Sequence, residues 1–115
     1  MKQIKYTPDA ADKLRYINKS ISLKYGSIKA KTVIRSITHA IRDLANNEQK
    51  GPSVEKIFGI VSNYRYIFVC KNYIFYNIEN DCIRIINIYN EKEDFMWSLF
   101  GIDTIPQESI DYWKE

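Results

Sequence analysis

The chain has 115 residues, of which 45% are hydrophobic and 27% are charged, and its formal net charge is +3. This length fits one domain with its own core, and this composition excludes an intrinsically disordered chain. No apolar run approaches the roughly 20 residues of a membrane span, and the first eight residues lack the apolar core of a signal peptide. We therefore expect a cytoplasmic protein with no membrane partner.

The charge is distributed unevenly along the chain. Residues 1–47 contain 10 Lys and Arg against 3 Asp and Glu, whereas residues 91–115 contain 2 against 7. A basic N-terminal half fits an anionic partner, either nucleic acid or an acidic protein segment. An ordinary solvated helix face explains the same pattern. If a partner binds here, we expect the contacts to come from Lys29, Lys31, Arg35 and Arg42.

The N-terminal half predicts a short strand followed by two helices. Alternation over residues 2–6 indicates the strand, and Thr7 and Pro8 then supply an N-cap and a first helical residue. Gly26 ends the first helix and Ser27 is expected to cap the second, so the helices fold back as an antiparallel hairpin. The two predicted apolar stripes are Ala10, Leu14, Ile17, Ile21 and Tyr25, then Ala30, Val33, Ile34, Ile37, Ile41 and Leu44.

The C-terminal half predicts a sheet. Residues 64–70, 73–79 and 82–89 are rich in aromatic and β-branched side chains, and Lys71–Asn72 and Asn80–Asp81 lie between them as turns. Residues 46–54 read as a loop and residues 55–61 as a further strand. Phe95 to Phe100 fit a short helix that stops at Gly101.

The predicted fold class is α+β: an N-terminal strand, an antiparallel helix hairpin packed on an antiparallel sheet of three to four strands, a short C-terminal helix and a tail. Residues 1–115 form one domain, with a core over 1–101 and an extension over 102–115. The acidic extension is expected either to pack as a structural element through Tyr112 and Trp113 or to fold back on the basic hairpin.

Residues that could bind a metal or cofactor are sparse. Cys70 and Cys82 lie in different predicted strands, and we expect both to be buried, reduced thiols. With one histidine, His39, and no closely spaced cysteine pair, no metal site and no cofactor are predicted. His39 is expected to be a partly exposed structural residue.

In order and spacing, the segments resemble the RelE/ParE superfamily, the toxins of type II toxin–antitoxin modules, over residues 2–101. The resemblance lies in the strand and helix start Ile4–Leu14, in Tyr64–Arg65, in Tyr73–Ile78 and Ile83–Ile88, and in Lys92–Glu93–Asp94. It is closer to ParE-like than to RelE-like members. It implies a growth inhibitor associated with plasmid stabilisation, neutralised by a cognate antitoxin with an acidic, partly disordered segment. A homodimer and a hetero-oligomer with the antitoxin both remain open.

The resemblance implies two competing mechanisms. RelE-like members cut messenger RNA in the ribosome, whereas ParE-like members are described as acting on DNA gyrase without being nucleases. If the chain is a nuclease, the candidate catalytic residues, matched by position, are Arg65, Tyr73, Arg84, Tyr89 and Lys92.

Several matched positions depart from the nuclease pattern. Asn90 stands where a histidine is frequent and carries no proton near neutral pH; Tyr73 cannot hold phosphate by charge, and the Arg65 guanidinium is a poor base. Tyrosines on the sheet could stack bases, but cross-strand packing is their usual role. We therefore expect a ParE-like inhibitor of gyrase rather than an enzyme. The alternatives are a ribosome-dependent messenger RNA endonuclease, with Tyr89 as proton donor, and an inactive partner-binding module.

Overall fold

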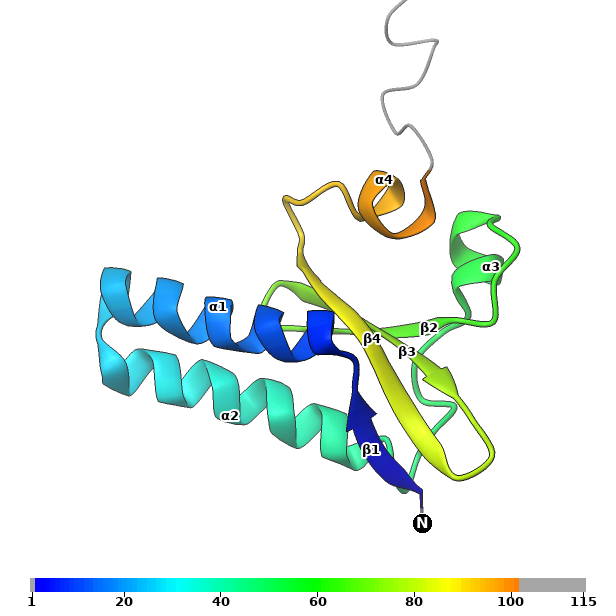
Figure 1. Cartoon of the computed structure of the whole chain (residues 1–115), viewed down its shortest axis with the longest axis horizontal. Coiled ribbons are helices and arrows are strands. Elements are labelled where there is room, and N and C mark those ends of the chain that lie inside the picture. The colour runs from blue at the N-terminus through cyan, green and yellow to red at the C-terminus, as the bar shows by residue number, and fades with distance from the viewer. Residues whose placement is uncertain (1, 102–115) are drawn as a thin grey trace, which may run out of the picture.

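The computed structural model describes residues 2–101, which form a helix hairpin, a four-stranded sheet and two short helices (Figure 1). The sheet order is β1-β4-β3-β2. The α+β prediction is confirmed. The elements are β1 (Gln3–Tyr6), α1 (Pro8–Tyr25), α2 (Ser27–Asp43), α3 (Val54–Phe58), β2 (Arg65–Val69), β3 (Asn72–Ile78), β4 (Cys82–Asn90) and α4 (Phe95–Phe100).

The sheet is mixed, so the prediction of a purely antiparallel sheet is wrong at one edge. β1 pairs with β4 in parallel, whereas β2–β3 and β3–β4 are antiparallel. Alternation along a strand indicates its two faces but not its partner or its direction. The contact between β1 and β4 continues where β1 enters α1: the Thr7 N–H donates to the Ile85 carbonyl (3.0 Å) and Thr7 Oγ1 donates to the Ile86 carbonyl (2.6 Å).

Thr7 also caps α1, as predicted: its Oγ1 accepts a hydrogen bond from the Ala10 N–H at 3.1 Å. The Ile86 carbonyl, which accepts from Thr7 Oγ1, belongs to a β-bulge. Phe75 pairs with Asn87 and Tyr76 with Ile85, which leaves Ile86 without a partner on β3. The extra residue shifts the alternation of β4, so Ile83 and Ile85 before it and Ile88 after it all face the helices.

The helix hairpin turns at a single residue. Gly26 is both the C-cap of α1 and the N-cap of α2, and its φ of 92° is a conformation that side-chain-bearing residues rarely adopt. The predicted cap Ser27 is instead the first residue of α2, and no side chain caps that helix. The apolar stripes are buried where the hairpin lies on the sheet, through Ala10, Ile37, Ile41 and Leu44 against Ile74, Tyr76, Ile83, Ile85 and Ile88.

The first predicted hairpin turn is displaced by one residue. Cys70 and Lys71 form the turn, with φ of 51° and 65°, and Asn72 begins β3. The Asn72 side chain supports the turn from the strand, because its Nδ2 donates to the Cys70 carbonyl at 2.8 Å. The second turn, Asn80–Asp81, lies as predicted and is closed by the Glu79 N–H donating to the Cys82 carbonyl at 2.9 Å.

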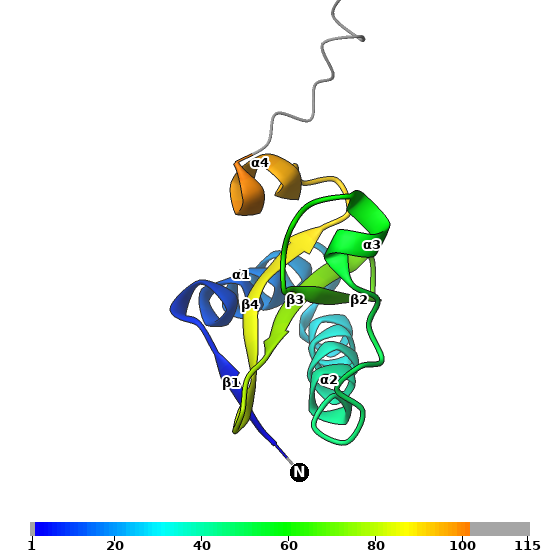
Figure 2. The same ribbon diagram turned by 90° about the vertical axis from the view of Figure 1, so that its right-hand side faces the viewer.

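Residues 55–61 do not form the predicted strand. Val54, Ile57 and Phe58 have the i, i+3, i+4 spacing of one helical turn, and Gly59 ends that turn in the left-handed region with φ of 70°. The resulting α3 covers the face of the sheet opposite the hairpin, together with α4, which runs from Phe95 to Phe100 as predicted and stops at Gly101 (Figure 2).

This second face carries an aromatic cluster around Phe75 and Tyr89, with Tyr64, Tyr66, Tyr73, Phe58, Phe95 and Phe100 around them. The cysteine prediction is half right, because Cys82 is buried but Cys70 is exposed in its turn. The extension over 102–115, with its two predicted arrangements, lies outside the described residues. Among residues 2–101, no helix is both long and apolar enough to cross a membrane.

Candidate functional site

Arg65, the first residue matched to nucleases, supports the loop between α2 and α3. It stands opposite Tyr76 at the start of β2, on the face that packs against the helices, and its Nη1 donates to the Gly51 carbonyl at 2.6 Å. Tyr76 holds the same loop, because its hydroxyl accepts from the Gly51 N–H (3.0 Å) and donates to the Glu48 carbonyl (2.8 Å). A side chain at Gly51 would lie 2.2 Å from the Tyr66 carbonyl oxygen, so the loop requires glycine.

Tyr73 and Tyr89 are cross-strand neighbours inside the aromatic cluster. The Tyr73 ring lies 4.8 Å from the rings of both Phe68 and Phe95. Tyr89 is 5% exposed, its hydroxyl accepts from Asn87 Nδ2 at 3.0 Å, and burial raises the pKa of its phenol. A buried phenol with a raised pKa is a weaker acid, which disfavours Tyr89 as a proton donor.

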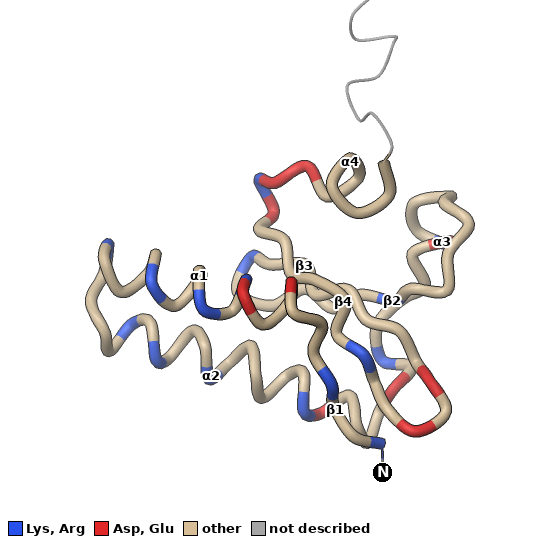
Figure 3. The backbone as a smooth tube through the Cα atoms, in the orientation of Figure 1, with Lys and Arg blue, Asp and Glu red and all other residues tan. Residues whose placement is uncertain are grey.

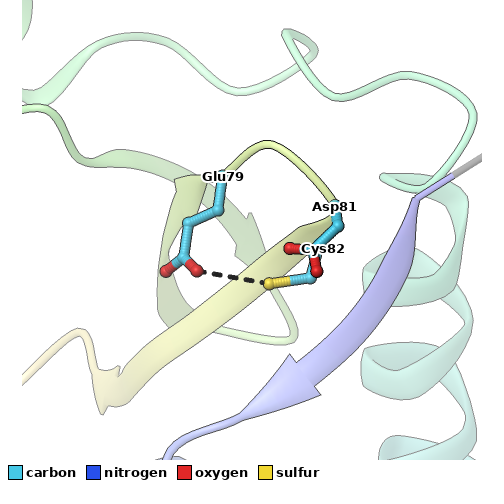
Figure 4. Close-up of side chains that lie close together, drawn as sticks. All are labelled: Glu79, Asp81 and Cys82. Atoms are coloured by element: carbon cyan, nitrogen blue, oxygen red, sulfur yellow. Dashed lines mark hydrogen bonds between the residues drawn. The ribbon is translucent and has the colours of Figure 1, made fainter.

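Arg84 lies toward the other end of β4 and is bound by a carboxylate. Its Nε and Nη2 donate to the two oxygens of Glu79 at 2.7 and 3.2 Å, and this pairing lowers the pKa of Glu79. The same carboxylate accepts from the Cys82 thiol at 3.4 Å (Figure 4).

The ligand atoms of Glu79, Asp81 and Cys82 lie within 4.8 Å of one another, a spacing that a metal ion could bridge. However, Arg84 already compensates the Glu79 charge, and burial raises the pKa of the Cys82 thiol. Because a metal binds the thiolate, this group is poorly prepared for a cation.

Lys92 is exposed in the segment between β4 and α4. The five matched residues are therefore divided between the two faces and the two ends of the sheet: Arg65 faces the helices, Tyr73 and Tyr89 lie in the aromatic cluster, and Arg84 lies beside the β3–β4 turn. They do not converge on one position where a phosphate could be held.

The helix hairpin is the most strongly charged part of the described chain. No Asp or Glu occurs between Asp12 and Asp43, whereas this interval holds eight Lys and Arg residues. Figure 3 shows Lys and Arg alone along the projecting part of both helices. All four predicted partner-binding residues are exposed on α2, and three of them, Lys31, Arg35 and Arg42, recur at spacings of four and seven. These three, here termed the α2 stripe, share one side of the helix.

A shallow groove adjoins the α2 stripe between the two helices. Its lining combines apolar Leu14 and Ile34 with polar Arg15, Asn18 and Lys31. Arg15 and Asn18 were not predicted from the sequence. Each directly follows a residue of the apolar stripe of α1 and lies beside that stripe on the helix surface. A helical projection of both helices together would have identified them. A second shallow depression on α2 is lined by Thr32, Arg35, Ser36 and His39, and His39 is exposed there.

Comparison with known proteins agrees with this architecture. The family model described as the ParE toxin of the type II toxin–antitoxin system, parDE, matches residues 4–95. The fold is similar to a structure titled "Chromosomal ParDE TA system from P. aeruginosa", with a TM-score of 0.66, 20% identity, and coverage of 78% of this chain and 96% of that chain.

A DinJ-YafQ complex from E. coli matches at a TM-score of 0.49 and 16% identity, covering 88% of this chain and 100% of that chain. The sequence has no match among curated proteins. Since the family model spans most of the chain, this protein belongs to the ParE toxin family of type II toxin–antitoxin systems.

Proposed function

We propose that this toxin inhibits growth by acting on DNA gyrase and is not a nuclease. Gyrase is the target that the resemblance to ParE-like members implies, and the match to the ParE family model supports that choice. The observation that argues against a nuclease is the dispersal of the five matched residues: Arg65 is bound to Gly51, Arg84 to Glu79, and Tyr89 is buried. Cleavage by a ribose 2′-hydroxyl needs a base, a charge stabiliser and a proton donor close to one phosphate. The described residues offer no such grouping.

We further propose that a cognate antitoxin neutralises the toxin through an acidic segment on the hairpin. The support is electrostatic and geometric. The α2 stripe runs over about 16 Å of helix at 1.5 Å per residue, and the adjoining groove has an apolar floor at Leu14 and Ile34. An acidic amphipathic segment matches both features, since its carboxylates would face the stripe and its apolar side chains the groove.

The target is tested by inducing the chain in a bacterial host without antitoxin and by adding the purified protein to gyrase. We expect growth arrest, messenger RNA without new 5′ ends inside codons, and inhibition of supercoiling. New cuts within translated codons would instead establish the endonuclease alternative. Normal growth would establish an inactive partner-binding module.

The antitoxin contact is tested by reversing charges on the stripe. Arg35→Glu with Arg42→Glu should weaken binding of the antitoxin encoded beside this gene by at least about tenfold, mainly by slowing association. Lys56→Glu with Lys92→Glu removes as much positive charge from exposed residues outside the hairpin and is the matched control. Equal losses in both variants would mean that net charge alone, and not the stripe, attracts the antitoxin.

A further inference from the structure

The turn of the helix hairpin exposes large apolar side chains that nothing in the described chain covers. Leu23 is 80% exposed, Tyr25 is 70% exposed and Ile28 is 82% exposed. They lie within three residues of Gly26 in the sequence, and the three together are here termed the hairpin tip. The predicted stripe of α1 included Tyr25 as a packed residue, and this is wrong because the sheet ends before the helix does. Figure 1 shows the end of the hairpin projecting well clear of the strands.

The hairpin tip is also surrounded by uncompensated positive charge. Lys19, Lys24 and Lys29 lie close to the tip residues in the sequence. Within residues 2–101, none of these three lysines forms an ion pair. Along α1 the nearest acid is Asp12, about 16 Å from Leu23 at 1.5 Å per residue. That separation exceeds the screening length of about 8 Å at physiological ionic strength, so the lysine charge is not neutralised locally.

We infer that the hairpin tip is the surface with which this toxin engages its target, and that it enters an apolar, acid-rimmed pocket on a folded protein. This inference rests on the proposed function, under which the target is gyrase. The tip is convex, whereas the antitoxin contact proposed above is a groove and a stripe. A projecting hairpin end that carries exposed apolar side chains among lysines is complementary to a concave site of opposite charge.

Other occupants fit the tip less well. A second copy of this chain would bring Lys24 and Lys29 against their own counterparts, since a two-fold interface pairs each surface with itself. Nucleic acid would use the lysines but not Leu23 and Ile28, because phosphate contacts come from charged and polar groups. An anionic membrane surface would contact both the lysines and the apolar side chains. The experiment below therefore distinguishes a membrane from a protein pocket.

The test compares two purified double variants with the unaltered full-length chain. Leu23→Ala with Ile28→Ala removes the tip, and Ile57→Ala with Val61→Ala removes two exposed apolar side chains elsewhere as the matched control. All four side chains are more than half exposed, so both variants should melt like the parent. Growth arrest on induction and binding to immobilised gyrase are then measured.

We expect the tip variant to lose growth arrest and to bind gyrase about 30-fold more weakly, the effect of a pair of anchor residues, while the control variant matches the parent. A tip variant that arrests growth like the parent overturns the inference. So does tip-dependent binding to vesicles of equal phosphatidylglycerol and phosphatidylcholine, or to a 20-base-pair DNA duplex, because the occupant would then be lipid or nucleic acid.

Failure of the proposed function gives a different pattern. A parent chain that does not arrest growth contradicts both proposals at once. A parent chain that arrests growth without binding gyrase contradicts only the choice of gyrase, and the tip is then judged by growth arrest alone: loss in the tip variant supports it, and retention overturns it.

Discussion

The two ends of the helix hairpin use the same kinds of residue in opposite environments. At the base, Ile37 and Ile41 are fully buried against the sheet, whereas at the tip Leu23 and Ile28 are 80% and 82% exposed. Both ends continue one pair of amphipathic helices, so periodicity alone does not distinguish them. The width of the sheet decides which apolar side chains are covered, and the uncovered ones are free to bind a partner.

The sharpest test of this comparison is one substitution at each end of α2. Ile41→Ala should lower the free energy of unfolding by about 2–4 kcal/mol, because it removes buried methylene groups and leaves a cavity. Ile28→Ala should change it by less than about 0.5 kcal/mol. Urea unfolding of both variants measures the difference. Similar losses would mean that the tip is packed in solution.

A second test concerns the loop beside the buried base. Tyr76→Phe keeps the ring but removes the hydroxyl that links the Gly51 N–H and the Glu48 carbonyl. Leaving these groups without a partner should cost about 1–3 kcal/mol in urea unfolding. Tyr25→Phe, which removes the hydroxyl of an exposed tip tyrosine, is the matched control and should have no measurable effect.

The starts of the two helices provide a third contrast. Thr7→Ala removes a cap that also holds the β4 bulge, so it should destabilise the fold by about 1 kcal/mol or somewhat more. Ser27→Ala should be nearly neutral, because no side chain caps α2. Thermal melting of the two variants decides the point, and a larger loss from Ser27→Ala would contradict the assigned caps.

The smallest effect is expected from the Glu79–Arg84 pair, which is partly exposed. Because Arg84 lowers the pKa of Glu79, the pair stabilises the fold above the ordinary carboxyl value of 4.5, and this contribution is lost as the pH falls through the lowered value. Glu79→Gln should therefore melt earlier than the parent at pH 7, with the gap closing toward pH 3. A gap that does not vary with pH would show that the charge is unimportant.

Local chemistry made much of the fold predictable. Thr7–Pro8, Gly26 and Gly101 placed helix ends, and the aromatic runs placed three strands. What failed depended on distant contacts. The parallel pairing of β1 with β4, and the contact of Thr7 with the bulge at Ile86, both join residues far apart in the sequence. The turn at Cys70 and Lys71 puts two residues other than glycine or asparagine at positive φ, against their usual preference.

The candidate site was less predictable than the fold. Lys31, Arg35 and Arg42 were identified from their charge and from the helical periodicity, which indicates the exposed face of α2 directly. The groove with Leu14 and Arg15 requires the packing of two helices, and the exposure of Leu23 and Ile28 requires knowing where the sheet ends. The sheet residues matched by resemblance shared spacing but not a common location, which only the strand register reveals.

We propose that toxicity comes from the hairpin and does not depend on the charged residues matched to nucleases, such as Arg84 in β4 and Lys92 after it. The direct measurement is gyrase supercoiling in the presence of a purified Arg84→Gln, Lys92→Gln variant beside the parent chain. We predict that both proteins inhibit supercoiling at the same concentration. Loss of inhibition in this variant, with the protein still folded at the assay temperature, would assign the activity to the residues matched to nucleases and contradict a role of the hairpin alone.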